Sequence, residues 1–525
     1  MKNVAVCALL LLGGCGPQPG DRGKDPPHDS GPVDTPLSWI LEPEVEAPVE
    51  GLFFARWLTL ETSVPTTITV QLDASGESLN RAFTDVDQLH RLPIMELWAD
   101  DTFEVEVTAT DAAGKTLSHH LTLTTQAMPP DFPILEALAH QPDRMEPGLT
   151  LFPLEAVQAS AWVCAIDAQL RVRWLLDVQP YAHDLRLGPD GDLWIVGGKQ
   201  VVRLSVMGET VGRWGPSDGD DKVLEFHHEA FPLEGGAFLS LARSSQWVDA
   251  YPMASDPTQP GSAALVYVPT LAEVEADGAL RTWIDLGQVL DLQRVGFDSH
   301  DRTPVGLDWG HANAVFPDGP DHWIVSLRHQ DALIRMDRDG QLDWIFANPD
   351  GWSKELDALR LTPIGEPFAW PFHQHGPERD ADGGLVLFDN GNHRATPYGT
   401  VYDDRPPHSR IVRYVIDPEA RTVSQDWSID ATSTGRLYSW AMGDADMQPA
   451  TGNVLAVYGL TTAEADTLNL DQGWGKHAAR IVEVHPDEPE SFLLDLRVRS
   501  DYLDRPVGWR VYRADRIPHL HPSVR

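Results

Sequence analysis

Four histidines occupy the same position in a repeated sequence pattern. Each opens a unit with a polar head, a glycine-rich turn and an apolar run: HDLRLGPDGDLWIV from His183, HEAFPLEGGAFLSL from His228, HANAVFPDGPDHWIV from His311 and HGPERDADGGLVLF from His375. Histidines with separate structural roles have no reason to choose one position of a repeat. A neutral imidazole is a nucleophile and a proton carrier near neutral pH. The pattern therefore predicts that the four side chains meet in one site with nucleophilic or acid–base chemistry.

Short strands must position these histidines, and the repeat predicts such strands. A second apolar element follows each head, for example VVRLSVMGETVGRW, ALIRMDRDGQLDWIF and RIVRYVIDPEARTVSQDW, and a variant head, SWAMGDADMQPATGNVLAVY, begins at Ser439. Counting the second elements gives about six units of four short strands, and sustained helical periodicity is absent. Residues 129–525 are therefore predicted to form an all-β, six-bladed β-propeller, with the heads converging at one end of its central channel.

A smaller unit and a linker precede the repeats. Residues 37–128 contain runs such as TTITVQLD and TFEVEVTATDAAGK, which alternate apolar and polar residues between turn residues. This alternation predicts a small antiparallel β-sandwich. Residues 16–36 are rich in Gly, Pro and Asp and cannot bury an apolar core, so they are predicted to form a flexible tether.

Residues 1–15, MKNVAVCALLLLGGC, have the organisation of an export signal. Lys2 precedes an apolar run that is too short to span a bilayer permanently, and small residues follow it. Leu-Gly-Gly-Cys resembles the bacterial lipoprotein box, which implies that Cys15 becomes the lipidated N-terminus. An ordinary cleaved signal is the alternative. We expect an exported protein of the cell envelope, lipid-anchored on the periplasmic side, with the outer membrane favoured.

The composition argues against one class of partner and against disulfide bonds. The formal net charge is −39, which argues against nucleic acid as a partner. The chain has three cysteines. Because Cys7 would leave with the signal and Cys15 would carry lipid, Cys164 would stand alone and no disulfide is expected in the mature chain. Cys164 lies in the apolar run SAWVCAID and is expected to be a buried apolar residue.

A set of segments in fixed order resembles the bacterial arylsulfotransferases. The segments are DWGHANAVFP, IVSLRHQDALIRMD with DWIFANPDGW, FHQHGPERDADGGLVLFDNGNHR and RIVRYVIDPEARTVSQDW. The resemblance covers nearly the whole chain after the tether. It implies ping-pong transfer of a sulfuryl group from an aryl sulfate to a phenol, without a nucleotide donor, cofactor or metal. It also implies a six-bladed propeller preceded by a small β-sandwich.

The resemblance assigns the nucleophile and one pair of neighbours. The family's sulfated histidine corresponds to His375 in the motif Gln374-His375, with His373 as a competing candidate. The family's His-x-Asn pair falls on His311 and Asn313.

Two further catalytic positions follow from the same resemblance. The arginine of the Ser-x-Arg-His-Gln segment falls on Arg328. An earlier histidine before an acidic residue falls on His228, and the adjacent His227 stays open as its alternative. Gly376-Pro377 replaces the carboxylate or alanine that is usual after Gln-His, a departure that concerns the acceptor side.

These residue types suit sulfuryl transfer. A sulfate monoester spreads one negative charge over three oxygens and is attacked in line with the leaving phenolate. Arg328 offers those oxygens a planar fork of donors, and Asn313 offers another hydrogen bond. His311 or His228 would protonate the departing phenolate and later deprotonate the acceptor phenol, whose reference pKa is about 10.

Residues beside these motifs have weaker interpretations. Asp389-Asn390-Gly391 is interpreted as a turn, and Arg394 stays open between substrate contact and the channel rim. Three tryptophans stand beside polar heads, where they either wall an aryl pocket or pack between blades. They are Trp309, Trp370 and Trp440.

Two other functions are compatible with the same fold. A metal-dependent propeller hydrolase would hold a divalent ion with histidines and acidic residues at the channel mouth, although an arginine is a poor neighbour for a cation. A non-catalytic binding lipoprotein would use the propeller alone, because a fold does not determine a function. Metal analysis and a transfer assay distinguish these hypotheses.

Overall fold

A computed structural model describes residues 35–156, 161–179, 182–215, 225–253, 259–304, 306–397, 400–430, 437–462, 477–499 and 508–520. Strands dominate, which confirms the all-β prediction, and the helical segments described are short. These segments are η1 (Pro142–Arg144), η2 (Glu234–Gly236), η3 (Leu286–Gln288), η4 (Arg328–Gln330) and α1 (Lys354–Asp357). Cys15, the predicted signal and nearly all of the predicted tether lie outside the described residues. Within the described ranges, no helix has the length and apolar character needed to cross a membrane.

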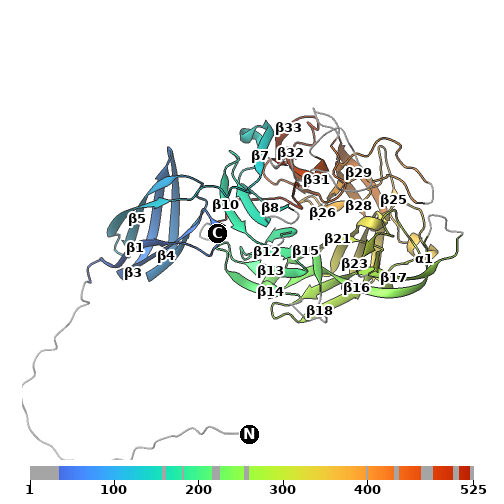
Figure 1. Cartoon of the computed structure of the whole chain (residues 1–525), viewed down its shortest axis with the longest axis horizontal. Helices are drawn as coiled ribbons and strands as arrows, with labels where there is room; N and C mark the ends of the chain where they lie inside the picture. Colours follow the sequence, from blue (N-terminus) through green and yellow to red (C-terminus); the bar gives the residue numbers. More distant parts are fainter. Residues whose placement is uncertain are drawn as a thin grey trace, which may run out of the picture.

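The N-terminal strands form one five-stranded antiparallel sheet, seen as a lobe beside the other sheets (Figure 1). It contains β1 (Trp39–Glu46), β3 (Arg56–Ala74), β4 (Glu77–Ile94), β5 (Thr102–Asp111) and β6 (Thr116–Thr124). β3 pairs with β1 before residue 62 and with β5 after residue 66, and it pairs with β4 on both sides of a register shift. The predicted sandwich is thus a single hydrogen-bonded sheet, because the long strands β3 and β4 pass through both halves.

Six further sheets follow in chain order. The first contains β2 (Leu52–Phe53), β8 (Leu149–Ala156), β9 (Ala161–Ile166), β10 (Val172–Asp177), β34 (Trp509–Arg510) and β35 (Asp515–Ile517). The second contains β11 (Asp184–Leu187), β12 (Leu193–Gly197), β13 (Gln200–Leu204) and β14 (Thr210–Trp214). The third contains β15 (Phe226–Pro232), β16 (Phe238–Tyr251), β17 (Ser262–Val274), β18 (Leu280–Asp285), β19 (Arg302–Thr303) and β20 (Gly306–Asp308).

The remaining three sheets continue the series. The fourth contains β21 (Ala312–Pro317), β22 (His322–Leu327), β23 (Ala332–Asp337) and β24 (Leu342–Ala347). The fifth contains β25 (Thr362–Pro363), β26 (His375–Arg379), β27 (Leu385–Asp389), β28 (Arg410–Asp417) and β29 (Thr422–Ile429). The sixth contains β7 (Ile134–His140), β30 (Asp444–Met447), β31 (Val454–Thr462), β32 (His477–Val484) and β33 (Phe492–Arg499).

The strands that begin successive sheets are neighbours in space. β11 contacts β15, β15 contacts β21, β21 contacts β26, and β26 contacts β30. Segments from the two ends of this region complete the first and the sixth sheet. β34 and β35 pair with β8 in the first sheet, and β7 pairs with β33 in the sixth. This arrangement brings the polar heads of the sequence repeat together, because each head lies at the start of one of these strands.

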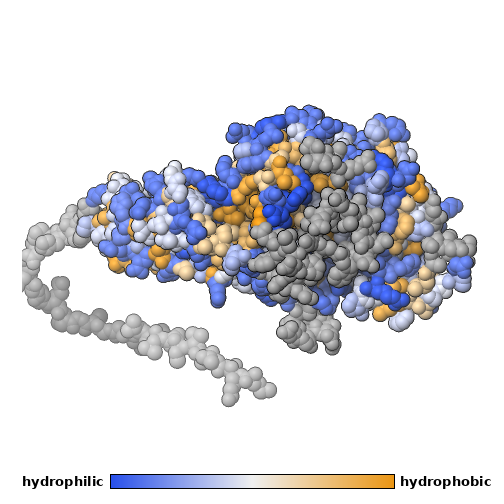
Figure 2. Space-filling model, turned by 45° about the horizontal axis from the view of Figure 1, so that its top comes forward, coloured by the Kyte–Doolittle hydropathy of each residue, from blue (hydrophilic) through white to orange (hydrophobic). Residues whose placement is uncertain are grey.

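Apolar side chains fill the spaces between consecutive sheets. Trp194 packs with Phe238. Ile324 and Val412 belong to one apolar cluster, and Phe388 and Val482 belong to another. A further cluster joins the first of the six sheets to the last and to the N-terminal sheet. Burying one large apolar side chain contributes about 1.5–3 kcal/mol. The surface in Figure 2 is mostly hydrophilic, as expected from the net charge of −39.

Cys164 belongs to this packing. It is fully buried in the cluster that joins the first and last sheets, and burial raises the pKa of its thiol. Cys164 is therefore an unreactive apolar residue, which confirms the sequence interpretation, and it is the one cysteine within the described ranges.

Candidate active site

The four histidines of the repeat converge as the sequence register predicts. The ring centroids of His183 and His228 are 5.1 Å apart, and those of His228 and His311 are 4.9 Å apart. Tyr512 lies among them, with its ring centroid 4.6 Å from that of His183, 6.0 Å from that of His228 and 6.1 Å from that of His375. Histidines from four different sheets thus share one site.

The backbone is irregular at the start of these strands, and this irregularity orients the side chains there. His228, His311, His373 and Met442 have positive φ values of 61°, 43°, 56° and 60°. Register shifts accompany them in the pairings β15–β16, β21–β22 and β26–β27. Left-handed backbone is costly for residues other than glycine, and it concentrates where a side chain must be held in one direction. Equivalent positions of successive sheets therefore carry strain that orients the site.

His375 has the geometry of a nucleophile. Its Nδ1 lies 2.6 Å from Asn390 Oδ1 and 3.1 Å from the carbonyl oxygen of His373, so Nδ1 carries the proton and Nε2 keeps its lone pair. The side chain is 2% exposed. Burial, with the positive charge of Arg328 as a second cause, holds the pKa of His375 well below its usual value. The imidazole is therefore neutral at physiological pH.

Asn390 fixes this tautomer, and the sequence interpretation as a turn missed its role. Its Nδ2 donates to the carbonyl oxygens of Ser439 at 2.8 Å and Met442 at 2.9 Å, which turns Oδ1 toward His375. The amide is fully buried. Asn390 is thus a positioning residue. Its place in Asp-Asn-Gly conceals this, because the same tripeptide is a common turn sequence.

Replacing Asn390 with aspartate should shift the pH dependence of the reaction. A carboxylate beside Nδ1 stabilises the imidazolium and raises the pKa of His375. The neutral fraction of His375 then falls as the pH drops through this higher pKa. We expect the acid limb of the pH–rate profile to move to higher pH in Asn390→Asp, and to stay in place in Asn80→Asp, an exposed residue of β4. An unchanged acid limb in Asn390→Asp would refute the assigned role.

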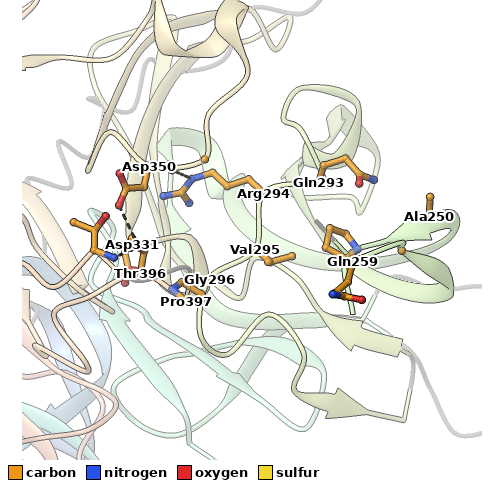
Figure 3. Close-up of a pocket in the computed structure, with 14 residues that line it drawn as sticks. Ala250, Gln259, Gln293, Arg294, Val295, Gly296, Asp331, Asp350, Thr396 and Pro397 are labelled. Carbon is orange, nitrogen blue, oxygen red and sulfur yellow. Dashed lines mark hydrogen bonds between the residues drawn. The ribbon is translucent and has the colours of Figure 1, made fainter. Parts of the chain in front are cut away.

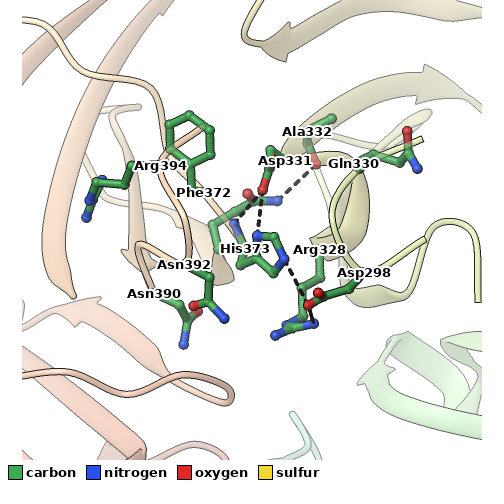
Figure 4. Close-up of polar contacts among 12 residues, drawn as sticks. Asp298, Arg328, Gln330, Asp331, Ala332, Phe372, His373, Asn390, Asn392 and Arg394 are labelled. Carbon is green, nitrogen blue, oxygen red and sulfur yellow. Dashed lines mark hydrogen bonds and ion pairs between the residues drawn. The ribbon is translucent and has the colours of Figure 1, made fainter. Parts of the chain in front are cut away.

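Both ring nitrogens of His373 are engaged by carboxylates. Its Nδ1 lies 2.8 Å from Asp331 Oδ1 and its Nε2 lies 3.1 Å from Asp298 Oδ2, so both ring nitrogens donate to carboxylates (Figure 4). Burial lowers the pKa of His373, but the two carboxylates outweigh burial and raise it to about 9. His373 is therefore an imidazolium at neutral pH and has no lone pair. The structure favours His375.

Arg328 stands beside this pair, and the described residues engage only part of its guanidinium. Its side chain is 4% exposed, Nη1 donates to Asp298 Oδ2 at 3.1 Å, and Nη2 donates to the carbonyl oxygen of Trp440 at 3.2 Å. Its Nε is buried and has no hydrogen-bond partner. A buried N–H without an acceptor is costly and rare. A cationic donor with a free N–H in a dry site is suited to an oxyanion.

His311 and His228 differ in their surroundings. Nδ1 of His311 lies 2.5 Å from Asp308 Oδ2, and its side chain is 28% exposed. Burial raises the pKa of Asp308, but His311 outweighs this effect and the pKa is held well below its usual value. His311 thus has the carboxylate partner that a proton carrier needs. Burial, and then the neighbouring histidines, hold the pKa of His228 well below its usual value, so His228 is neutral.

The choice between His227 and His228 follows from their directions. Nε2 of His227 lies 2.6 Å from the hydroxyl of Tyr267 and 3.3 Å from the carbonyl oxygen of Ala242, away from the shared site. The ring of His228 faces His183 and His311 instead. His228 is the member of the pair that lies in the site.

Asn313 and Arg394 are engaged by the protein itself. Asn313 Nδ2 donates to the carbonyl oxygen of Gln374 at 2.7 Å, so this amide holds the segment that precedes His375. Arg394 donates to Asp389 Oδ2 at 2.9 Å and to the carbonyl oxygen of His408 at 2.8 Å, and it is buried. Asn313 therefore acts as a positioning residue here, and Arg394 stabilises the turn after β27.

The three tryptophans separate into two groups. Trp309 is buried and donates to the carbonyl oxygen of Arg294 at 2.6 Å, and Trp370 packs on Phe346 and Phe368 between sheets. Trp440 lies at the site, with the guanidinium carbon of Arg328 5.7 Å from the centroid of its ring. Of the three, only Trp440 can face a substrate.

A second aromatic surface stands near Trp440. The rings of Phe297 and His393 stack with centroids 4.2 Å apart, and His393 is 6.0 Å from His373. Phe297 and Trp440 are partly exposed and His393 is exposed. Partly exposed aromatic rings beside a buried cation suit a ligand with an aryl group at one end and an anion at the other.

A cavity of about 530 Å³ adjoins the site. Arg294, Asp331, Asp350 and Thr396 line it (Figure 3). Asp331 also contacts Nδ1 of His373, which links the cavity to the site. Arg294 is engaged with the carbonyl oxygens of Asp350 at 3.0 Å and Gln330 at 2.6 Å. Among the described residues that line the cavity none is aromatic, and its walls combine these polar groups with small apolar residues such as Ala250 and Val295.

Two carboxylates of the site, Asp298 and Asp308, already have partners in the protein. Asp298, Asp301 and Asp308, together with His311 and His329, include two groups whose ligand atoms approach closely enough for a metal. Asp298, however, contacts Arg328 and the imidazolium of His373, and Asp308 contacts His311. Adding a divalent cation here would bring it against an arginine. These residues fit proton transfer and anion binding better than metal binding.

Comparisons with known proteins identify the family of this chain. A family model described as arylsulfotransferase (ASST) matches residues 135–510. A stretch of 139 residues is 32% identical to the arylsulfate sulfotransferase AssT of Escherichia coli O6:H1 (strain CFT073), covering 23% of this chain and 23% of that protein.

Similarity to solved structures is remote. A member of the DUF4221 family from Bacteroides vulgatus aligns with a TM-score of 0.29 and 8% identity, covering 73% of this chain and 99% of that one. The extracellular domain of a one-component system from B. thetaiotaomicron aligns with a TM-score of 0.29 and 9% identity, covering 88% and 60%. Such scores carry no weight for the fold. The family model spans most of the chain and includes every histidine of the site, and the chain therefore belongs to the arylsulfotransferase family.

Proposed function

We propose that this protein is an aryl sulfate sulfotransferase that carries the sulfuryl group on His375 between an aryl sulfate donor and a phenolic acceptor. Two features of the site together carry the proposal. The imidazole of His375 is neutral with its Nε2 free, and the nearby guanidinium of Arg328 is buried with its Nε free. Family membership supports the same chemistry. Because the match to the E. coli enzyme covers 23% of each chain, the support comes mainly from the site.

In the first half-reaction, Nε2 of His375 attacks the sulfur in line with the aryl oxygen. An N–S bond forms, the S–O bond to the aryl group breaks, and the phenolate accepts a proton from His311, which Asp308 orients. Arg328 stabilises the negative charge on the sulfuryl oxygens. His228 is the alternative proton donor, but its depressed pKa makes it the weaker acid–base partner.

In the second half-reaction, the acceptor phenol takes the place of the departed phenol. His311 removes its proton, the phenolate oxygen attacks the sulfur, and the N–S bond breaks, which returns His375 to its neutral form. Each half-reaction balances without a cofactor or metal ion. Trp440, Phe297 and His393 provide the aromatic surface for the ring of either substrate.

The proposed framework for this chemistry is a six-bladed β-propeller over residues 129–525, which follows an N-terminal β-domain over residues 37–128 in the chain. Six sheets in chain order support the propeller, as do contacts between their first strands. Apolar packing between consecutive sheets, and between the last and the first, gives further support. A propeller accounts for the convergence of repeat heads, because equivalent positions of its blades meet around one channel.

The proposed location is the cell envelope, through lipid on Cys15. The support is the short basic start, the apolar run and the sequence Leu-Gly-Gly-Cys. Cys15→Ser should therefore shift the full-length protein from the membrane fraction to the soluble fraction, or leave it unprocessed. Wild-type protein that is soluble with an unmodified N-terminus would contradict the proposal.

The direct test of the function is incubation of the purified protein with 4-nitrophenyl sulfate, with and without phenol. We expect sustained release of 4-nitrophenol and formation of phenyl sulfate only when phenol is present. Sustained hydrolysis without phenol that requires a metal would favour the hydrolase instead. Binding of 4-nitrophenyl sulfate without any release would favour a non-catalytic binding protein.

A further inference from the structure

A group of six carboxylates surrounds two arginines where the first strands of the sheets lie together. The carboxylates are Asp184, Glu229, Glu378, Asp444, Asp446 and Asp515, and the arginines are Arg186 and Arg513. We call this group the acidic cluster. If all its members are ionised, negative charges exceed positive charges by four, an imbalance that is costly at low dielectric.

The arginines neutralise only part of the acidic cluster. Arg513 donates from Nε to Asp184 at 2.8 Å, from Nη2 to Glu229 at 2.8 Å and from Nη1 to Glu378 at 3.4 Å. Arg186 donates to Glu229 at 2.9 Å and also contacts Glu378. Asp184, Glu229 and Glu378 therefore have guanidinium partners at hydrogen-bond distance.

Asp444 has no such partner. It is fully buried, and neither of its carboxylate oxygens makes a hydrogen bond within the part of the chain that the structure describes. The nearest cationic atom is Nη1 of Arg513 at 3.7 Å, beyond hydrogen-bond distance. An isolated buried carboxylate is among the most unfavourable groups in a folded protein. The structure thus holds a carboxyl group in its interior without the contacts that usually stabilise the ionised form.

Asp446 and Asp515 complete the geometry of a cation site. One oxygen from each of Asp444, Asp446 and Asp515 lies within 4.8 Å of the other two. Oδ1 of Asp446 also lacks a hydrogen-bond partner. Asp446 and Asp515 are partly exposed, which gives an ion access to the buried Asp444. Three oxygens at this spacing can contact one ion whose metal–oxygen distances are about 2.3–2.6 Å.

We propose that Asp444, Asp446 and Asp515 bind a divalent cation, and that the cation is Ca²⁺. The ligands are all carboxylate oxygens, which hard cations prefer and which disfavour zinc or copper. Ca²⁺ tolerates irregular coordination completed by water, whereas Mg²⁺ demands a near-octahedral arrangement. This site is separate from the catalytic histidines, and the proposal is independent of the sulfotransferase activity.

The cation would connect β30, which contacts the nucleophile's strand β26, to the C-terminal segment. Asp444 begins β30 and Asp515 begins β35, which pairs with β8. Gly376, directly after His375, has a φ of 51°, and a Cβ added there would lie 2.3 Å from Asp444 Oδ1. The carboxylate therefore packs against the residue next to the nucleophile. A structural cation at this point would hold together strands from distant parts of the chain.

Protons are the competing way to neutralise the acidic cluster. Burial raises the pKa of Asp444 to about 8 and that of Asp515 to about 6. Protonated carboxyl groups would make the stability of the fold depend on pH and leave it insensitive to Ca²⁺. Bound Ca²⁺ would make stability rise with the concentration of the ion, because ligands that bind the folded state stabilise it.

The test uses the full-length protein, treated with EDTA and dialysed at neutral pH. We expect about one Ca²⁺ per chain by elemental analysis after Ca²⁺ is restored, and a saturable rise in Tm of several degrees. Asp446→Asn and Asp515→Asn should each lose most of this response, since both are isosteric and reduce the negative charge. The control is Asp487→Asn, whose side chain is 91% exposed, and it should respond like the wild type.

Each contrary result overturns the proposal. Wild-type protein whose Tm ignores Ca²⁺ but rises on acidification would assign the acidic cluster to protons. A Ca²⁺ response that is unchanged in both Asp446→Asn and Asp515→Asn would place the ion elsewhere. A larger saturable rise with Mg²⁺ than with Ca²⁺ would overturn the assignment to Ca²⁺. If a variant fails to fold, bound Ca²⁺ in the wild type and the other variant still decide the outcome.

Discussion

Replacing His375 with asparagine should abolish both the first release of 4-nitrophenol and steady-state transfer. The wild type, mixed with donor alone, should release about one equivalent of phenol per enzyme and then stop, because the sulfuryl group has no acceptor. Asparagine keeps much of the shape but has no nucleophilic nitrogen. Loss of a covalent nucleophile typically costs about 10⁴-fold or more. Rapid-mixing absorbance measurements detect the burst directly.

Two histidine variants serve as controls for this result. His120→Asn removes an imidazole that is 74% exposed on β6, and it should leave burst and turnover unchanged. His373→Asn removes the imidazolium between Asp331 and Asp298, and it should keep the burst amplitude while lowering stability. A full burst in His375→Asn, or none in His373→Asn with His375 intact and the fold preserved, would contradict the assignment.

The stability contribution of His373 has a defined pH range. Its pKa is raised to about 9 in the folded protein from an unfolded value near 6.5. The contribution is therefore complete below about pH 6.5 and is lost as the pH rises through about 9. The His373→Asn variant lacks this contribution, so the difference in Tm from the wild type should shrink over that range.

Replacing Arg328 with alanine should slow formation of the intermediate by about a hundredfold or more, as expected for loss of a charged donor that acts in the transition state. The fall should appear in the burst rate more than in KM. Arg328→Lys should recover little, because a lysine has no equivalent of the free Nε and cannot span Asp298 and Trp440 with a planar fork. The matched control is Arg213→Ala, an exposed residue of β14. An Arg328→Ala burst rate close to the wild type would show that this arginine does not contact the sulfuryl group.

The convergence of the histidines was predictable from sequence because it depends on a repeat. Strands that begin equivalent units lie side by side, so His183, His228, His311 and His375 meet although they are far apart in the sequence. The all-β class was predictable for the same reason, from alternating apolar residues and frequent turns. The N-terminal domain was less predictable, because the sequence gives no sign that β3 joins both halves into one sheet.

The detailed roles depend on contacts that no local pattern contains. The choice between His373 and His375 rests on Asp298, Asp331 and Asn390, which come from other segments. His373 precedes β26 and has a left-handed backbone with a φ of 56°, whereas His375 begins the strand, so the two side chains meet different partners. Asn390 resembled a turn residue because its function lies in a contact with a different strand of its sheet.

The contacts of individual side chains also explain the remaining differences between the sequence interpretation and the structure. Arg394 lies next to a motif residue, but its charge is taken by Asp389. Trp309 and Trp370 lie beside polar heads, but their rings turn into the packing between sheets. Trp440 has the same sequence context and faces Arg328. The sequence position of these residues indicated that they lie near the site, and the direction of each side chain decided its role.

The most direct test of the central claim is mass spectrometry of the enzyme trapped with 4-nitrophenyl sulfate in the absence of phenol. Peptides prepared under mild conditions preserve the N–S bond long enough to locate the group. The account predicts one sulfuryl group per chain, on His375, that disappears when phenol is added. A sulfuryl group on His373 or another residue would contradict the assignment of the nucleophile, and active enzyme without any modified residue would contradict the two-step mechanism.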